Sequence, residues 1–445
     1  MYLLRIECSD NEGRPRPLEE YRTMPKSRAP EAQSAGELDS SFGLRTLKFP
    51  GASKTIGEGV ATTPSGHIMV SATVIVASGH SYYGLARLDA DGNPDPTFGS
   101  AGYRWEQFGN GVFSQGGRLI VDTNGRILMC GLINRTPTGY QQVIARFKPD
   151  GSLDPEFGDE QTGFKVVPMR IPALTNAFDG SLVLAKSAPQ VVTPDRLLFV
   201  TSKGGSGLLT RFLLDGKDDV EFAGKGWIHL TQPDVAITLH GVTLLYDGEI
   251  LVHGKTEVTN QGLVMAFDSA GEVATSFGQG GALLLNLRHA GAPLESSVNR
   301  IVVQSAQRLL LIGSAVESSA GEKRQHGFVS GITRVGGFDP AFNGGAPVIT
   351  AATQSLDLKG WSAGFALDDF PGPRIVMLGQ TSAGQRQLLT GGFLVDGAVD
   401  PAFDVEGAAA IEWIAQDACL QGSSVLVLGQ SNEAAQLVRL LTAAG

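Results

Sequence analysis

Four aspartates stand near the ends of apolar stretches that have the length of short strands, and carboxylates in such places can do chemistry. They are Asp122, Asp247, Asp368 and Asp417. Two carboxylates held together at raised pKa can act as general acid and general base. The same residues also suit turns, because an aspartate carboxylate accepts backbone N–H bonds. These four are the candidate ligand-binding residues, with both interpretations left open.

Two short motifs match catalytic or phosphate-binding patterns but have the wrong context. Residues 360–364, Gly-Trp-Ser-Ala-Gly, have the spacing of a nucleophile elbow, which needs a strand, a turn and a helix in an α/β sheet. The chain shows no such alternation, so we expect a loop before a strand here. Gly254-Lys255-Thr256 resembles the end of a phosphate loop, but the upstream glycine is one residue out of place and the segment follows a strand. Neither motif predicts a catalytic residue.

One segment suggests calcium. Residues 89–95, Asp-Ala-Asp-Gly-Asn-Pro-Asp, place oxygen-bearing side chains at alternate positions. In other copies of a repeat that runs through the chain, the position of Asp89 holds Lys148, Leu213 or Leu394. The repeat is therefore not built around an ion. We expect no cofactor and no metal, with calcium in this one segment as the alternative.

Histidines and cysteines give no metal-binding pattern. The seven histidines include no i, i+4 pair with a catalytic glutamate, and His240 and His253, which flank a predicted hairpin, are expected to be ordinary imidazoles. The three cysteines, Cys8, Cys130 and Cys419, form neither a disulfide framework nor a ligand cluster.

Tryptophans bear on sugar binding, because sugars stack on exposed aromatic faces. Trp105, Trp227 and Trp413 stand at different distances from the repeat motif. Equivalent glycan sites in every repeat are therefore not expected, and a single glycan site stays open.

The elements that position these residues come from an internal repeat. A short motif, most complete as Asp-Pro-x-Phe-Gly, recurs seven times between residues 38 and 403. Its phenylalanines are Phe42, Phe98, Phe157, Phe222, Phe277, Phe342 and Phe403. They recur about every sixty residues, a period long enough for several short strands per unit.

Each unit has the strand content of one propeller blade. A strand ending in Asp-Gly precedes most motifs, another strand follows, and then comes a hairpin, clearest around Asn124-Gly125 between two apolar runs. Four short strands per unit predict a β-propeller. The last segment, residues 437–445, resembles the strand before the motif, and the motif that it lacks is the first one, at Leu38. We therefore expect an all-β, seven-bladed propeller of four-stranded blades, in which an N-terminal outer strand near 43–49 completes the C-terminal blade.

The Asp-Pro-x-Phe-Gly signature after an Arg-Leu/Phe…Asp-Gly strand resembles the delta-60 repeat, over about residues 38–445. The resemblance implies a bacterial β-propeller, and it implies no particular activity because members mostly lack an assigned biochemical function. Many members are surface or secreted proteins with signal peptides. This chain shows no signal peptide, so a cytoplasmic location is expected, with export by a signal-independent route as the alternative.

The motif has a structural interpretation. Aspartate followed by proline suits the start of a turn, and we expect the phenylalanine to be buried between adjacent blades. Arginine stands eight residues before the motif aspartate in three pairs: Arg87/Asp95, Arg146/Asp154 and Arg211/Asp219. In a fourth unit both positions are alanine, Ala266 and Ala274, whereas Gly392 before Asp400 departs from the rule. The pattern predicts an arginine–carboxylate bridge that recurs around the ring.

Composition limits the function classes. The chain has 445 residues, 58 of them glycine, and a formal net charge of -10, which argues against nucleic acid and anionic lipid as partners. No apolar run is long enough for a membrane span. Residues 1–37 are rich in charge and proline and are expected to form a poorly ordered N-terminal tail or, alternatively, a docking segment, whereas residues 38–445 form the propeller.

The function expected from these features is that of a non-enzymatic binding or scaffold protein. A rigid propeller presents loops on which recognition generally occurs, and the ligand is expected to be a protein. The long units 157–222 and 277–342, with the polar insertion Ala315–Gly327, are the places expected to differ from the others. One alternative is an enzyme, a hydrolase or lyase, with the four aspartates at the mouth of the channel. The other is a glycan-binding protein with one site.

Overall fold

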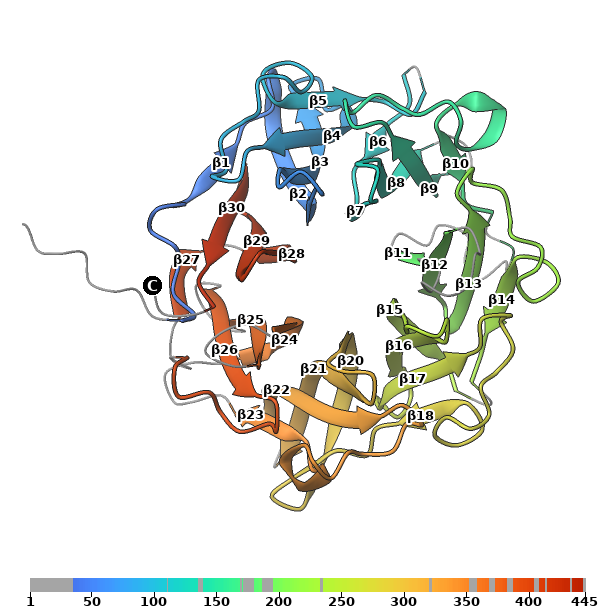
Figure 1. Cartoon of the computed structure of the whole chain (residues 1–445), viewed down its shortest axis with the longest axis vertical. Coiled ribbons are helices and arrows are strands. Elements are labelled where there is room, and N and C mark those ends of the chain that lie inside the picture. Colours follow the sequence, from blue (N-terminus) through green and yellow to red (C-terminus); the bar gives the residue numbers. More distant parts are fainter. Residues whose placement is uncertain are drawn as a thin grey trace, which may run out of the picture.

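The protein is a seven-bladed β-propeller, as the repeat predicts. In this computed structural model the described residues are 35–109, 111–134, 139–168, 170, 180–185, 195–232, 235–319, 322–351, 358–367, 373–381, 387–403, 408–412, 414–432 and 434–442. Within them, seven antiparallel sheets stand side by side in a ring (Figure 1). The residues of the candidate aspartate Asp368 and of Trp413 lie outside the described part of the chain, as do residues 1–34 of the expected tail.

Each blade has the same strand order from the centre outwards. The innermost strands are β2 (Ala52–Thr62), β6 (Ser114–Gln115) with β7 (Leu119–Val121), β11 (Gly180–Ala185), β15 (Ile237–Leu244), β20 (Ala292–Val303), β24 (Leu358–Leu367) and β28 (Ile414–Gln421). The second strands are β3 (Ile68–Val76), β8 (Ile127–Asn134), β12 (Arg196–Lys203), β16 (Ile250–Thr256), β21 (Arg308–Ser319), β25 (Arg374–Thr381) and β29 (Ser424–Gln430).

The outer half of each blade carries the repeat motif between its third and fourth strands. The third strands are β4 (Ser81–Leu88), β9 (Tyr140–Phe147), β13 (Ser206–Leu213), β17 (Gly262–Phe267), β22 (Glu322–Thr333), β26 (Gln387–Leu394) and β30 (Ala435–Leu440). The fourth strands are β5 (Tyr103–Glu106), β10 (Phe164–Val166), β14 (Trp227–Leu230), β18 (Ala282–Leu284), β23 (Val348–Ala351), β27 (Ala408–Glu412) and β1 (Arg45–Leu47). A short strand, β19 (Arg288–His289), pairs with β20, and short 3-10 turns occupy Asp159–Gln161 and Asn343–Gly345.

The second strands are apolar on both faces because each blade is packed between two others. In β3, the seven residues from Ile68 to Val74 are all buried. Strands covered on both faces lose the alternation of polar and apolar residues that half-exposed strands show. The hydrophobic core therefore lies between blades, as a ring of seven clusters.

The ring closes through the two ends of the chain, as predicted. Strand β1 pairs antiparallel with β30, with Arg45 opposite Leu437. This pairing leaves the last blade with four strands and covers the edge of β30 with the short outer strand β1. Ala35 bridges Phe403, and the N–H of Gly36 donates to the carbonyl of Leu441 at 2.8 Å. Residues 35–37, which the sequence-based boundary puts in the tail, thus pair with the propeller.

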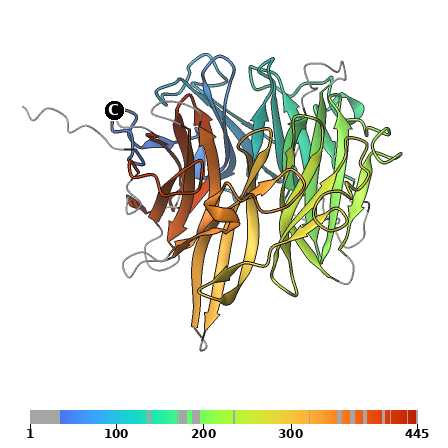
Figure 2. The same ribbon diagram turned by 60° about the horizontal axis from the view of Figure 1, so that its bottom comes forward.

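One blade is longer than its neighbours. The residues expected to form a polar insertion between strands instead extend β21 and β22 to twelve residues each, paired continuously with Ala315 opposite His326. Figure 2 shows this orange blade reaching below the rest of the ring. Continuous pairing explains the difference, because the polar residues keep the backbone hydrogen bonds of the strands.

The motif phenylalanines lie between blades, and each packs against a glycine of the next blade. All seven rings are at most 3% exposed. A Cβ on Gly151, for example, would lie 2.4 Å from the ring of Phe98, and the φ of this glycine is +82°. The corresponding glycines at the other junctions are Gly36, Gly92, Gly216, Gly271, Gly336 and Gly397. Both the close approach and the positive φ favour glycine, which explains the repeated Asp-Gly turn.

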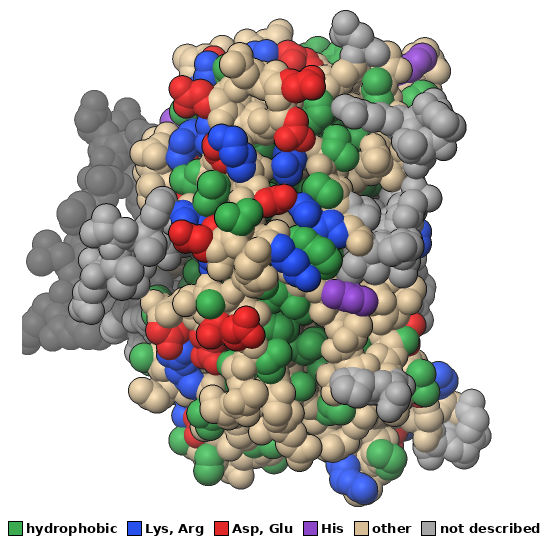
Figure 3. All heavy atoms as spheres, turned by 90° about the vertical axis from the view of Figure 1, so that its right-hand side faces the viewer, with side chains coloured by type: hydrophobic (Ala, Val, Ile, Leu, Met, Phe, Trp, Pro, Cys, Tyr) green, Lys and Arg blue, Asp and Glu red, His purple; other side chains and the backbone are tan. Residues whose placement is uncertain are grey.

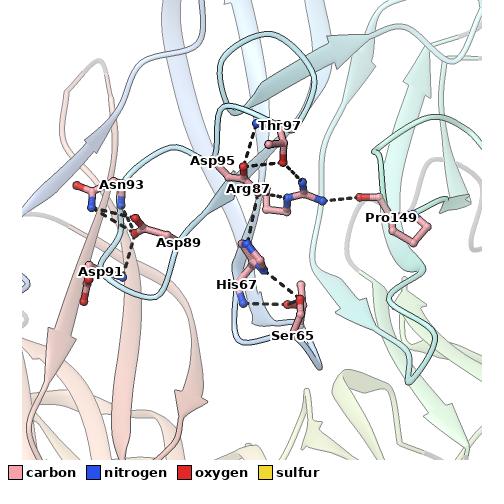
Figure 4. Close-up of polar contacts among 10 residues, drawn as sticks. Ser65, His67, Arg87, Asp89, Asp91, Asn93, Asp95, Thr97 and Pro149 are labelled. Carbon is pink, nitrogen blue, oxygen red and sulfur yellow. Dashed lines mark hydrogen bonds and ion pairs between the residues drawn. The ribbon is translucent and has the colours of Figure 1, made fainter.

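The predicted arginine–carboxylate bridge is present and also spans the junction. Nε of Arg87 donates to Asp95 at 2.7 Å, and the same guanidinium donates to the carbonyl of Pro149 in the next blade at 3.0 Å (Figure 4). The Asp95 carboxylate in turn accepts from the backbone N–H and the hydroxyl of Thr97. The pairs Arg146/Asp154 and Arg211/Asp219 repeat this arrangement, and Arg439 with Asp39 repeats it at the closure.

The exception at Gly392 has a steric cause. A Cβ on Gly392 would lie 2.3 Å from the ring of Phe403, and Gly331 has the same relation to Phe342 at 2.5 Å. An arginine cannot occupy either position, because its Cβ would clash with the phenylalanine side chain. The first residue of the second strand supplies the guanidinium instead: Arg374 lies 3.4 Å from Asp400, and Arg308 pairs with Asp339.

The junction that lacks the pair is bridged in another way. Where Ala266 and Ala274 replace the arginine and aspartate, Arg334 of the next blade reaches back to Asp247 at 2.6 Å and to Glu249 at 2.8 Å. The candidate residue Asp247 therefore takes part in an ion pair between blades.

The surface carries mixed charge, and no helix in the described residues is long and apolar enough to cross a membrane. On the side that faces right in Figure 1, acidic and basic side chains are interspersed over the outer rim (Figure 3). Mixed signs leave no broad patch of one charge on this face.

Candidate functional site

The centre of the ring is a polar cavity built on a repeated irregularity of the innermost strands. Five of them contain a β-bulge, in which one residue has no partner on the second strand. At the channel the bulged residues are Glu58, His240, Asn299, Ser362 and Gln416, and β2 and β24 each have a second register shift, at Ser53 and at residues 359–360. All five are polar and line the central cavity or the chamber that adjoins it. The bulge therefore places a polar side chain at the channel in each of these five strands.

Glycine in the second strand makes room for the bulge. A Cβ on Gly254 would lie 2.0 Å from the carbonyl oxygen of Thr238, and one on Gly313 would lie 1.9 Å from that of Ser297. Side chains at these positions would push the inner strand away. This geometry also corrects an expectation, since Gly360–Gly364 is part of strand β24 and not a loop, with Ser362 at its bulge.

Three charged residues meet in the cavity. Arg118, Arg300 and Asp417 come from three different blades and line a space of about 640 Å³. Arg300 and Asp417 each directly follow a bulged residue, so the bulge sets their register. Two cations and one anion thus line the same space.

Neither guanidinium is neutralised by a direct contact. Among the residues that the structure describes, Arg118 and Arg300 make no side-chain hydrogen bond and no ion pair within 4.0 Å. Arg300 packs with its Cζ 5.4 Å from the centre of the Phe365 ring. An Asp417 oxygen accepts instead from the backbone N–H of Val60 at 3.0 Å. The guanidinium N–H groups are therefore available to a ligand.

Burial sets the protonation states in the cavity. Burial raises the pKa of Asp417, against the opposing effect of Arg118 and Arg300. Burial lowers the pKa of Arg300, yet arginine stays charged because its ordinary pKa lies above 12. Burial also lowers the pKa of His253 to about 3, so this imidazole is neutral at pH 7. The positive charge of the cavity is therefore carried by the two arginines, whereas burial works against ionisation of the Asp417 carboxyl group.

The cavity cysteine is not a nucleophile. Burial, together with the nearby Asp417 carboxylate, raises the pKa of Cys419 to about 12. The thiolate is the reactive form, and it is scarcely populated at neutral pH under these conditions.

The three candidate aspartates in the described part of the chain are not brought together. Asp417 lines the cavity from the middle of β28. Asp122 is 3% exposed and closes a turn, accepting the N–H groups of Asn124 and Arg126 at 2.9 Å and pairing with the Arg126 side chain at 2.7 Å. Asp247 takes part in the ion pair with Arg334 described above. The structure thus places three of the four candidate aspartates, and of these three Asp417 faces the cavity.

The suggested calcium segment has internal partners. The Asp89 carboxylate accepts the backbone N–H groups of Asp91 and Asn93 at 3.0 and 2.8 Å and the side-chain amide of Asn93 at 3.1 Å (Figure 4). These contacts are those of a turn closed by an aspartate.

The two arginines were missed by sequence reasoning, although a signal exists. Arg118 and Arg300 stand at the same distance along the sequence from the glycine of the following strand, which is Gly131 for the first and Gly313 for the second. Asp417 stands one position nearer to Gly429, which occupies the corresponding place. An alignment of inner strands on that glycine would have set the two arginines at the same position and Asp417 at the next one.

Glu58 gives a pH-dependent prediction. Burial raises its pKa to about 7, although the hydroxyl of Thr73 donates to it at 2.7 Å. Because the unfolded carboxyl has an ordinary, lower pKa, its contribution to stability is present at low pH and is lost as the pH rises towards and through 7. We expect the melting temperature of the wild type to fall relative to that of Glu58→Gln between about pH 5 and 8. If the melting temperatures of the two proteins instead change in parallel with pH over this range, the pKa of Glu58 is not raised.

Comparison with known proteins supports the fold class. The profile of a family described as "Domain of unknown function (DUF5122) beta-propeller" matches residues 63–98 and 123–157. Both segments run to a motif phenylalanine, Phe98 and Phe157, in successive blades. The match supports a β-propeller repeat family, and the name delta-60 repeat stays a prediction. A search of curated proteins finds no match.

Several solved structures are similar at low identity. A protein of unknown function from Dyadobacter fermentans DSM 18053 is 11% identical, with 90% of this chain and 99% of that chain covered and a TM-score of 0.40. A glucose dehydrogenase is 12% identical, with 89% and 99% covered and a TM-score of 0.40. The Hadza microbial sialidase Hz136 is 11% identical, with 88% and 66% covered and a TM-score of 0.35. No activity is transferred from them to this chain.

Proposed function

We propose that the protein is a non-enzymatic binding protein whose central cavity takes a small anionic molecule. The observation that carries this proposal is the pair of arginines, Arg118 and Arg300, that line the cavity without a direct counter-charge among the described residues. Guanidinium groups hold carboxylates and phosphates through two parallel hydrogen bonds, which favours such ligands over neutral ones.

The size and the charge of the cavity favour the same ligand class. A volume of about 640 Å³ is in the range of small-molecule sites and leaves no room for a folded partner. With His253 neutral, two arginines share the cavity with one carboxyl group, Asp417, whose pKa is raised by burial, so the cavity has a net positive charge. A carboxylate or phosphate ligand would neutralise the positive charge of the cavity.

The ring of bulged residues supplies the remaining contacts. Asn299, Ser362 and Gln416 present amide and hydroxyl groups to the same cavity. The Ser362 hydroxyl already donates to the carbonyl of Leu378, and one amide N–H of Asn299 donates to that of Trp361. The second N–H of Asn299 and the amide of Gln416 can donate to oxygen atoms of the ligand and fix its orientation. Polar side chains in small numbers around a largely preformed pocket are typical of ligand specificity.

The proposal is tested by titration with anions of increasing size at constant ionic strength. The probes are phosphate, sulfate and dicarboxylates such as succinate. Chloride is the background salt and keeps the ionic strength constant, so that electrostatic screening is the same in every titration. We expect Arg118→Gln and Arg300→Gln each to weaken binding about 10- to 100-fold, because hydrogen bonds to charged groups contribute about 1.5–3 kcal/mol each. Isothermal calorimetry and the shift of the melting temperature measure the loss.

Two further variants sharpen the result. Arg324→Gln, which removes a guanidinium 71% exposed on the long hairpin, is the matched control and should leave affinity unchanged. Asp417→Asn should leave anion binding intact or strengthen it, because it removes the carboxyl group that lines the cavity together with the arginines. Equal affinity in all four variants, or a loss of binding in Asp417→Asn, would contradict the proposal.

The other functions suggested by the sequence stay predictions. These are a protein partner at the loops, a single glycan site, and an enzyme that uses the aspartates. An enzyme of that kind would lose turnover in Asp417→Asn, which is the opposite of the effect on affinity expected here.

A further inference from the structure

A second cluster of polar side chains lies on the long blade, away from the central cavity. His289 of β19, Glu317 of β21 and His326 of β22 come from three strands of one sheet. Nδ1 of His289 lies 3.3 Å from an oxygen of Glu317, and Nε2 of His326 lies 3.4 Å from the same oxygen. The ligand atoms of all three residues lie within 4.8 Å of one another.

The extension of the hairpin creates this cluster. Glu317, paired with Arg324, lies near the extended end of β21, and His326, paired with Ala315 and with Ala351 of β23, lies where the extension begins. The β19–β20 hairpin then folds His289 back over them, with His289 opposite Ala292. The two histidine rings lie 5.5 Å apart, at 49° to each other.

The buried histidine is the unusual member. His326 is 3% exposed, and neither of its ring nitrogens makes a hydrogen bond within the described part of the chain. An imidazole buried without a partner is unfavourable, and buried polar groups in folded proteins are nearly always satisfied. Its Nε2 is directed towards the Glu317 oxygen without the geometry of a hydrogen bond. A ligand between these groups would satisfy both.

We propose that His289, Glu317 and His326 bind one divalent transition-metal ion, with Zn²⁺ as the ion that fits best. Zinc binds histidine nitrogen and carboxylate oxygen at about 2.0–2.2 Å, so two ligands of one tetrahedral ion lie about 3.3 Å apart. Both contacts to Glu317 already have this separation. The third separation is the distance between the ligand nitrogens of His289 and His326. The His289 side chain is 38% exposed and can rotate to shorten it.

The type and number of ligands define the kind of site. Two imidazoles and one carboxylate favour zinc over calcium or magnesium, which prefer oxygen ligands only. Three protein ligands leave the fourth coordination position for water or an incoming group, whereas structural zinc sites usually use four. The site would also link β19 to the hairpin of β21 and β22.

The test is metal binding by the full-length, tag-free chain after removal of metals with a chelator. Zn²⁺ alone is the probe, measured by equilibrium dialysis with elemental analysis, and Co²⁺ reports the coordination geometry through its visible spectrum. We expect one equivalent of zinc per chain. His289→Gln and Glu317→Gln should each weaken binding at least tenfold, and both positions are exposed enough for the variants to fold.

Controls separate this site from other histidines and from the central cavity. His229→Gln, at an exposed position on β14, and Arg300→Gln, in the cavity, should both bind zinc like the wild type. Wild-type protein that binds no stoichiometric zinc would overturn the proposal. So would undiminished binding by His289→Gln and Glu317→Gln, and in that case the cluster is a set of hydrogen-bonded side chains only. Neither result bears on the anion site.

Discussion

Replacing Phe157 by alanine is expected to destabilise the propeller by about 3–5 kcal/mol, the usual loss for a buried aromatic ring. The ring is 1% exposed and packs in a cluster with Leu197, Phe199 and Phe212 of the next blade. Its edge also lies against Gly216, where a Cβ would be 3.2 Å away. The substitution therefore leaves a cavity between blades that neither blade can fill alone. Chemical denaturation, compared with the wild type under the same conditions, measures the loss.

The matched control is Phe338→Ala. Phe338 is 38% exposed, and substitutions at such positions usually change stability by less than about 0.5 kcal/mol. A loss below about 1 kcal/mol for Phe157→Ala would show that the motif phenylalanines do not hold the blades together.

Removing Arg146 is expected to have an effect of similar size. Its guanidinium pairs with Asp154 at 2.8 Å, and both side chains are buried, at 4% and 7% exposed. It also donates to the carbonyl of Leu214 in the next blade and lies 5.3 Å from the ring centre of Phe157. Arg146→Ala leaves Asp154 buried without its partner, which costs about 3–5 kcal/mol in comparable pairs.

A double-mutant cycle separates the pair from the rest of the junction. Asp154→Ala, Arg146→Ala and the double variant should be non-additive, with a coupling of roughly 0.5–3 kcal/mol. Glu156→Ala is the control, since this carboxylate lies 4.0 Å from Arg146 but is 86% exposed. Additive losses would mean that the contact between Arg146 and Asp154 contributes nothing of its own.

The fold could be predicted because it is repeated. Seven copies of one motif gave the number of blades, and the complementary ends of the chain gave the closure by β1 and β30. The arginine rule was incomplete at Gly331 and Gly392, because the steric conflict with Phe342 and Phe403 is visible only in three dimensions.

The cavity was less predictable for a physical reason. A β-bulge changes which face of a strand the following residues occupy, so the alternation of side chains along the sequence no longer identifies the inner face. Asp417 was singled out as a candidate, whereas Arg118 and Arg300 were not, because nothing in the alternation of side chains marks these two arginines as facing the channel. Asp122 and Asp247 were singled out because they stand near the ends of strand-like stretches. Aspartates are common there because they close turns and form ion pairs, as these two do.

The histidine cluster could not be found from spacing. His289, Glu317 and His326 are separated in the sequence and meet only because β21 and β22 extend as one hairpin. Metal-binding patterns in a sequence describe ligands on one helix or one loop, and cross-strand ligands on a sheet leave no such pattern.

The central claim is that the two cavity arginines hold an anion, and diffraction from crystals soaked in bromide tests it most directly. Bromide scatters anomalously and competes for anion sites without forming other bonds. We predict an anomalous peak in the central cavity beside the guanidinium groups of Arg118 and Arg300, and its loss in the double variant with glutamine at both positions. Peaks confined to the outer surface, with the cavity free of bromide in the wild type, would contradict the claim.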